Sequence, residues 1–181
     1  TGPLRDYSPM LAPQSLVLYA KETMFILSSD WDSSNNASAV VEAHAKYNKY
    51  LDQNKSAFPS SAFAFATAKW HHDFSDHKAL HDSWLTELVV LEGGNSGARS
   101  TSIKLKLLGA YQDGHLNLVY ENVSAYQLGS AVAGHTSIDR DEVRLSDDGN
   151  VVHEIIWWQS VKWLIECEDI KFDWVPIDVG V

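Results

Sequence analysis

The alternation of apolar and polar residues divides the chain into an N-terminal part with helical spacing and a C-terminal part with strand spacing. Over residues 39–54, Val40, Tyr47 and Leu51 recur at i, i+7 and i+11, which predicts the buried face of a helix. A second, shorter helix is expected after the Phe-Pro-Ser-Ser sequence, because proline is tolerated in a first helical turn. Residues 39–70 are therefore expected to form the helical part of the fold.

Further along the chain the period changes to two residues. Ile103, Leu105 and Leu107 alternate with lysines, so one face of this strand is expected to pack while the other is solvated. The sequence Asp-Asp-Gly-Asn at residues 147–150 predicts a hairpin turn. Together these patterns predict an antiparallel meander sheet of about six to eight strands over residues 82–176.

The beginning of the chain has a weaker pattern. Residues 1–14 contain three prolines and predict an irregular lead-in, whereas the apolar runs of residues 15–29 predict one or two buried strands. Helices followed by antiparallel strands define the α+β class, in which we expect the N-terminal segment and two helices to pack on a mostly antiparallel meander sheet. No repeat or linker indicates a second domain, so residues 1–181 are expected to form one.

Composition and charge exclude several classes of function. The formal net charge of −10 would repel phosphate backbones, and no cluster of basic residues occurs, so we expect no binding of nucleic acid. No apolar run is long enough to span a bilayer, so we expect no membrane partner. The single cysteine, Cys167, cannot form an internal disulfide, which favours a cytoplasmic location.

The C-terminal quarter of the chain combines acidic residues with tryptophans. Residues 139–181 contain eleven acids and four bases, which indicates either a solvated acidic face or a surface that attracts a basic protein. Adjacent Trp157 and Trp158 must point to opposite faces of one strand, so one of them is expected to be exposed unless other elements cover it. The expected partner-binding residues are Trp157, Trp158, Glu166, Glu168, Asp169, Asp173 and Trp174.

Two alternatives apply to the same C-terminal residues. Glu166 and Glu168 point to one face of a predicted strand, so they are candidates for an acid/base pair or a cation site as well as for protective edge-strand charges. Exposed tryptophans also stack on sugars, which leaves a carbohydrate-binding module as an alternative function.

Residues 71–82 contain four histidines and three aspartates. His77 and His81 have the i, i+4 spacing that places two imidazoles on one helical face, and with Asp82 they are candidate ligands of zinc or iron. The hydrolytic zincin pattern is absent, because Lys78 occupies the position where that pattern requires glutamate. A metal-dependent enzyme that uses this cluster is one alternative. A polar connection in which His81 or Asp82 fixes the first strand through backbone hydrogen bonds is the other.

Other catalytic groups are not evident, and no catalytic residue is assigned. The chain has no Gly-x-Ser-x-Gly elbow, phosphate-binding loop or dinucleotide fingerprint. Cys167 lies among acids that would raise its pKa, and His153, on a predicted strand face with Ile155 and Trp157, is expected to be a core histidine with its hydrogen bonds satisfied. We therefore expect a non-enzymatic protein without a cofactor.

The order of these features resembles small uncharacterised bacterial α+β domains in which a His-Asp pair opens a meander sheet. The features are the helix with Tyr47 and Tyr50-Leu51, Phe58-Pro59, His81-Asp82, the sequence Leu-Leu-Gly-Ala-Tyr at 107–111 and the sequence Trp-Leu-Ile-Glu-Cys-Glu-Asp at 163–169. Domains of this kind are similar to the immunity proteins of bacterial toxin systems. The resemblance implies a stand-alone bacterial cytoplasmic protein that binds and inhibits a basic partner, and it implies no catalytic residue.

Overall fold

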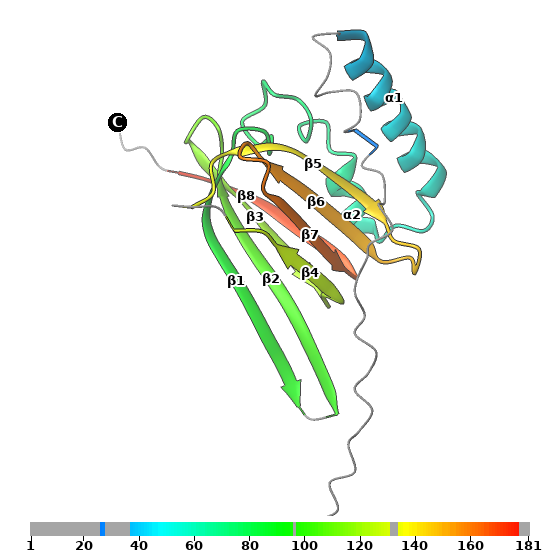
Figure 1. Cartoon of the computed structure of the whole chain (residues 1–181), viewed down its shortest axis with the longest axis vertical. Helices are drawn as coiled ribbons and strands as arrows, with labels where there is room; N and C mark the ends of the chain where they lie inside the picture. Colours follow the sequence, from blue (N-terminus) through cyan, green and yellow to red (C-terminus); the bar gives the residue numbers. More distant parts are fainter. Residues whose placement is uncertain (1–25, 28–36, 96, 131–133, 178–181) are drawn as a thin grey trace, which may run out of the picture.

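Two helices and two four-stranded sheets make up the part of the chain that the computed structural model describes, namely residues 26–27, 37–95, 97–130 and 134–177 (Figure 1). The helices are α1 (Ala37–Asn54) and α2 (Ser60–Ala66), and the strands are β1 (Trp84–Asn95), β2 (Ala98–Leu108), β3 (Gly114–Glu121), β4 (Ala125–Leu128), β5 (Ile138–Leu145), β6 (Val151–Trp157), β7 (Lys162–Cys167) and β8 (Asp169–Pro176). The predicted lead-in and most of the predicted N-terminal strands lie outside the described residues; Ile26 and Leu27 form a turn.

The strand order confirms the α+β class and its antiparallel strands, but the strands form two sheets where one meander was predicted. One sheet has the order β1-β2-β3-β8 and the other β4-β7-β6-β5, with every pair antiparallel. The first sheet therefore joins three consecutive strands, β1 to β3, to the last strand, β8, whereas the second contains the four consecutive strands β4 to β7. The crossings from β3 to β4 and from β7 to β8 tie the two sheets together.

The crossing from β7 to β8 interrupts the predicted strand that contains both Glu166 and Glu168. Cys167 and Ile170 are both buried although they are an odd number of residues apart, which a single continuous strand would not allow. The break falls at Glu168, whose backbone N–H donates to the carbonyl oxygen of Glu121 (3.0 Å). The change of phase moves the chain from one sheet to the other.

Helix α1 confirms the predicted helix to within two residues at its start. Its buried face carries Tyr47 and Leu51, as the spacing predicted. The Tyr47 hydroxyl donates to the Val143 carbonyl oxygen (2.8 Å) and accepts from the Val143 N–H (3.0 Å). Since β5 is an edge strand, α1 satisfies backbone groups that would otherwise face solvent or another chain.

Helix α2 is shorter than predicted. It ends at Ala66, and turns rather than helix continue through Trp70. Its start is fixed from the neighbouring sheet, because the Asp169 carboxylate accepts a hydrogen bond from the Ala62 N–H (2.9 Å) and the Ser61 hydroxyl donates to the Ile170 carbonyl oxygen (2.7 Å). Contacts with β8, rather than helix length, therefore position α2.

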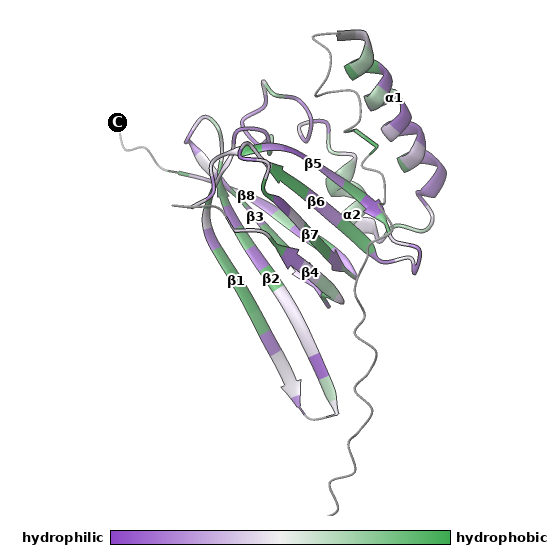
Figure 2. Cartoon of the chain, viewed as in Figure 1, coloured by the Kyte–Doolittle hydropathy of each residue, from purple (hydrophilic) through white to green (hydrophobic). Residues whose placement is uncertain are grey.

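The apolar core lies on the inward faces of the strands and against both helices. The predicted alternation in β2 is confirmed, with Ile103, Leu105 and Leu107 all buried. Strand β1 differs, because its middle is apolar (Figure 2) yet Leu88 and Leu91 are exposed, and with β2 it extends beyond the other strands (Figure 1). None of the described helices is long and apolar enough to cross a membrane.

Candidate functional site

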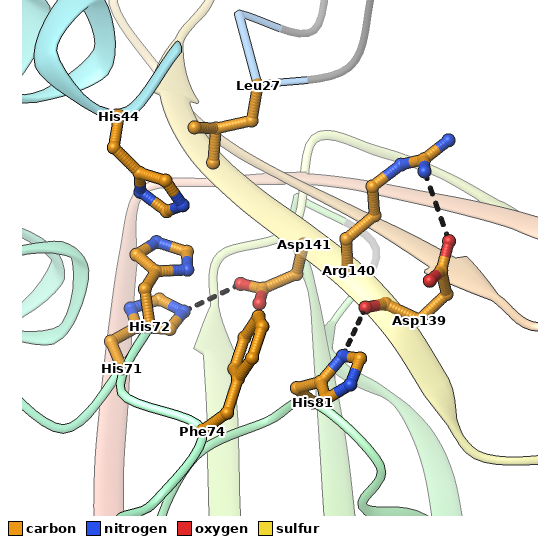
Figure 3. Close-up of a pocket in the computed structure, with 9 residues that line it drawn as sticks. All are labelled: Leu27, His44, His71, His72, Phe74, His81, Asp139, Arg140 and Asp141. Carbon is orange, nitrogen blue, oxygen red and sulfur yellow. Dashed lines mark hydrogen bonds and ion pairs between the residues drawn. The ribbon is translucent and has the colours of Figure 1, made fainter. Parts of the chain in front are cut away.

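A small cavity lies among α1, the connection from α2 to β1, and β5 (Figure 3). Its volume of about 20 Å³ is enough for one water molecule or one ion and too small for an organic substrate. Imidazoles and carboxylates dominate its walls. The lining residues are Leu27, His44, His71, His72, Phe74, His81, Asp139, Arg140 and Asp141.

His71 and Asp141 form the buried base of this cavity. His71 Nδ1 donates to the carbonyl oxygen of Phe65 (2.9 Å), and Nε2 donates to Asp141 Oδ2 (2.7 Å). Burial opposes the charged imidazole, but the Asp141 charge and these hydrogen bonds outweigh it and raise the pKa of His71. The pKa of Asp141 is held below its usual range, since His71 and His153 outweigh the effect of burial.

The same carboxylate oxygen receives a second imidazole. His153 Nε2 donates to Asp141 Oδ2 (2.9 Å), and His153 Nδ1 accepts from the Tyr120 hydroxyl (2.7 Å). Burial lowers the pKa of His153, which fits a neutral ring with one donor and one acceptor nitrogen. Tyr120 lies in β3 and His153 in β6, so this network links the two sheets. The prediction of a satisfied core histidine is confirmed.

His72 is the group that this network leaves without a hydrogen bond. Its ring stacks on that of His71 (4.3 Å between centroids) and lies 5.3 Å from the ring of His44. Its Nε2 atom is buried and has no hydrogen-bond partner in the described part of the chain. Burial, followed by the charge of His71, lowers the pKa of His72 to about 3. One ligand atom each from His71, His72 and Asp141 lie within 4.8 Å of one another.

The three metal ligands that the sequence predicted do not form one site, although His81 Nε2 lies 3.5 Å from Asp82 Oδ2. Residues 71–82 form turns rather than a helix, so the i, i+4 spacing places no two imidazoles on one face. His77 Nδ1 bonds instead to the Asp113 carboxylate on the surface, and His81 Nδ1 donates to the Asp139 carbonyl oxygen (2.7 Å). Among the described residues, the donors close enough to hold a metal are His71, His72 and Asp141.

His81 and Asp82 instead have the structural role that the sequence offered as the alternative. The Asp82 N–H donates to the Ile138 carbonyl oxygen (2.8 Å), just before β1 begins, and Asp82 has a positive φ of 60°. With the His81 bond to β5, this anchors the start of β1 on the other sheet. The polar connection between helices and strands is therefore confirmed.

The two adjacent tryptophans point to opposite faces, as predicted. Trp158 is 56% exposed and its Nε1–H donates to Asp82 Oδ1 (3.0 Å). Trp157 is 1% exposed and packs on Trp163 (5.0 Å between ring centroids). Trp157 therefore belongs to the core, and its expected contact with a partner is corrected: its ring is buried against Trp163 and against His135 (4.8 Å between ring centroids).

The acids expected beside Trp158 lie elsewhere. Glu166 pairs with Val152 at the start of β6, whereas Trp158 follows the last residue of that strand. Glu168 and Asp173 are exposed and accept hydrogen bonds from Asn122 and Asn117. Their side chains remain available to a partner. The remaining two have structural contacts: Asp169 fixes α2, and Trp174 is half-buried over Gly109 and Gly114.

A surface aromatic group surrounds Trp158 in place of the acids. We call Phe74, His81, Trp84 and Trp158 the aromatic patch. The Phe74 ring stacks on His81 (4.1 Å), which contacts Trp158 edge-on (6.1 Å). Trp84 pairs with Ser137, whose carbonyl oxygen accepts from the Trp158 N–H (3.2 Å). Because cross-strand neighbours share a face, Trp84 and Trp158 flank Ser137 on one side.

Sequence reasoning missed two parts of this region. Asp141 lies in the segment Asp-Arg-Asp-Glu, where a run of charges suggested solvent exposure, yet the residue is buried. Trp84 was not among the predicted site residues, because its pairing with Ser137, 53 positions later in the sequence, is specified by no local pattern. The sequence signal closest to indicating a buried charge was that the charged residues of β5 lie in a segment with the spacing of a strand.

No model of a known protein family matches the chain, and no curated protein matches it. The resemblance to immunity-type domains therefore stays a prediction.

Proposed function

We propose that this protein is a non-enzymatic bacterial binding domain, an immunity-type inhibitor, that uses the aromatic patch to bind a basic protein. The observation that carries the proposal is the pair Trp84 and Trp158, 57% and 56% exposed on one face. Tryptophan is the side chain most enriched where single residues dominate the affinity of an interface. Two such side chains on one face therefore favour a contact surface over random exposure.

The structure around Trp158 supports binding without reorganisation. The Asp82 carboxylate accepts from both the Trp158 indole (3.0 Å) and the Ser137 hydroxyl (3.2 Å), so the indole has a fixed orientation. A side chain that is already ordered loses less conformational entropy when a partner covers it. Asp82 thus prepares the central aromatic group of the patch.

Charge supports a basic partner. The net charge of −10 attracts a cationic protein over distances near the Debye length of roughly 8 Å and beyond at low salt. Exposed Glu168 and Asp173 add to this field. A cytoplasmic location is part of the proposal, because the one cysteine of the chain is a free, buried thiol.

The test is capture from a lysate of the encoding organism with three baits. Wild type and Tyr126→Ala, an exposed aromatic residue on the far edge strand β4, are expected to retain the same basic protein. Trp158→Ala is expected to lose it, and high salt is expected to weaken it. The captured protein's own activity should then fall when wild-type chain is added in equimolar amount.

Two results would overturn the proposal. One is retention of the partner by Trp158→Ala as strong as by wild type. The other is a shift of tryptophan fluorescence with soluble glycans that Trp158→Ala abolishes, which would assign the patch to carbohydrate binding instead. Circular dichroism of each variant checks that the fold is unchanged.

A further inference from the structure

We propose that His71, His72 and Asp141 form a binding site for one divalent transition-metal ion, with Zn²⁺ as the ion to test first. This site lies beneath the aromatic patch but does not depend on the proposed function, since it concerns a buried cavity rather than the protein surface (Figure 3). It also differs from the ligand set that the sequence predicted.

The donor set fits this class of ion. Two imidazole nitrogens and one carboxylate oxygen suit Zn²⁺ and Fe²⁺, whereas Mg²⁺ and Ca²⁺ prefer oxygen ligands alone. The donors come from separate parts of the chain: His71 and His72 from the connection before β1, and Asp141 from β5. The cavity beside them, with a volume of about 20 Å³, holds one ion.

The distances require only a small adjustment. With metal–ligand bonds of about 2.1 Å, the donors of a tetrahedral site are roughly 3.4 Å apart. The three donor atoms lie within 4.8 Å of one another, so each needs to move by about 1 Å or less. The metal would replace the proton that His71 Nε2 now donates to Asp141, and that proton would leave to solvent.

The groups behind the donors are those that metal-binding histidines and carboxylates usually have. His71 Nδ1 donates to the Phe65 carbonyl oxygen, which directs Nε2 toward the cavity. Asp141 is held from behind by His153, which is in turn bonded to the Tyr120 hydroxyl. These contacts fix the orientation of two of the three ligands without a metal.

His72 distinguishes a metal site from a purely structural network. Hydrogen bonds within the protein account for His71, Asp141, His153 and Tyr120, but not for the buried Nε2 of His72. A buried polar atom without a partner lowers the stability of the folded state. A metal ion in the cavity would accept the lone pair of this nitrogen and remove that loss.

The experiment uses the full chain with any affinity tag removed. Metal content after purification is measured by elemental analysis, and Zn²⁺ is titrated into chelator-treated protein against a chromophoric competitor. We expect one equivalent bound with a Kd below about 1 μM, together with the release of protons. Co²⁺ in place of Zn²⁺ should show absorption bands of a four-coordinate site.

Three variants assign the ligands. His72→Ala breaks no hydrogen bond of the described chain, so it is expected to fold and to bind Zn²⁺ more than about 100-fold more weakly. Tyr120→Phe, two hydrogen bonds behind the ligand Asp141, is expected to weaken binding about 10-fold. His77→Ala is the matched control from the same histidine-rich segment and should bind as wild type does.

Several outcomes overturn the inference. Wild-type protein that binds no Zn²⁺, Fe²⁺ or Co²⁺ with a Kd below about 100 μM has no such site. Unchanged affinity in a folded His72→Ala variant, or a loss in His77→Ala instead, places the metal elsewhere. None of these results bears on capture of a basic protein through Trp158, so the two proposals fail separately.

Discussion

At the scale of single residues, the molecule's most unusual feature is a charged network inside the core. Asp141 accepts from two imidazoles on one oxygen, and Tyr120 completes the chain from the other sheet. The sequence predicted a satisfied core histidine at 153 from strand alternation, because that depends on local spacing. It did not predict that Asp141 also binds His71, since β5 and the connection before β1 meet only in the folded chain.

Removing the outermost hydroxyl of this network should have a measurable cost. In Tyr120→Phe, His153 Nδ1 would remain buried but would lose the hydroxyl group that donates a hydrogen bond to it. We expect the free energy of unfolding to fall by about 1–3 kcal/mol. The slope of this free energy against urea concentration should not change. Urea denaturation followed by circular dichroism measures this. Tyr126→Phe on the exposed strand β4 should stay within about 0.5 kcal/mol of wild type; equal losses in both variants would contradict the prediction.

The thiol of Cys167 should be unreactive in the native protein. Burial, followed by the charges of Asp169 and Glu166, raises the pKa of Cys167 to about 12. A raised thiol pKa favours the neutral form, so at pH 8 only about one thiol in ten thousand would be the reactive thiolate. An aromatic disulfide reagent should therefore label the folded chain only as it unfolds, and fully in urea. Gln159→Cys, in an exposed turn, should add one thiol that reacts at once.

At the scale of elements, the spacing of apolar residues predicted a helix or strand correctly where the element buries one face. It failed where the chain passes from one sheet to the other. Helix α1 was predicted because its stripe has one buried face, which carries Tyr47 and Leu51. The break at Glu168 was not predicted, because it depends on β8 lying in the first sheet. A pattern of period two records which face is buried but not which sheet buries it.

Asp169 illustrates this dependence and should be a structural residue. Its carboxylate accepts from the N–H groups of Ala62 and Ile170, and it pairs with Lys171. Asp169→Ala is expected to lower the free energy of unfolding by about 1–2 kcal/mol, comparable to the loss of a helix N-cap. Asp173→Ala, on the same strand but exposed, should change it by less than about 0.5 kcal/mol. Thermal and urea unfolding of both variants compare the two; a larger loss at Asp173 would show that β8 is stabilised differently.

At the scale of the whole molecule, the two crossings separate groups that the sequence placed together. The sequence predicted one surface with tryptophans and acids, because residues 157–174 are close along the chain. In the antiparallel sheet, Glu166 lies opposite Val152 at the start of β6. Trp158 follows the last residue of the same strand, so the two side chains lie at opposite ends of β6. The hydrogen bonds of exposed Glu168 and Asp173 also involve other residues than those that contact Trp158. A short-range contact and a long-range charge field can then be changed independently.

This separation predicts a division of binding kinetics with the captured partner. Trp158→Ala removes a contact made only after docking, so we expect faster dissociation and little change in the association rate. Glu168→Lys combined with Asp173→Lys changes the field but no contact of the patch, so association should slow about tenfold at low salt, with unchanged dissociation. Surface plasmon resonance at two salt concentrations measures both rates. The charge effect should vanish at high salt, whereas the Trp158 effect should persist, because screening acts on distant charges and not on buried apolar contact. Faster dissociation in the charge variant would mean that the partner contacts Glu168 or Asp173 directly and that these acids bind together with the aromatic patch.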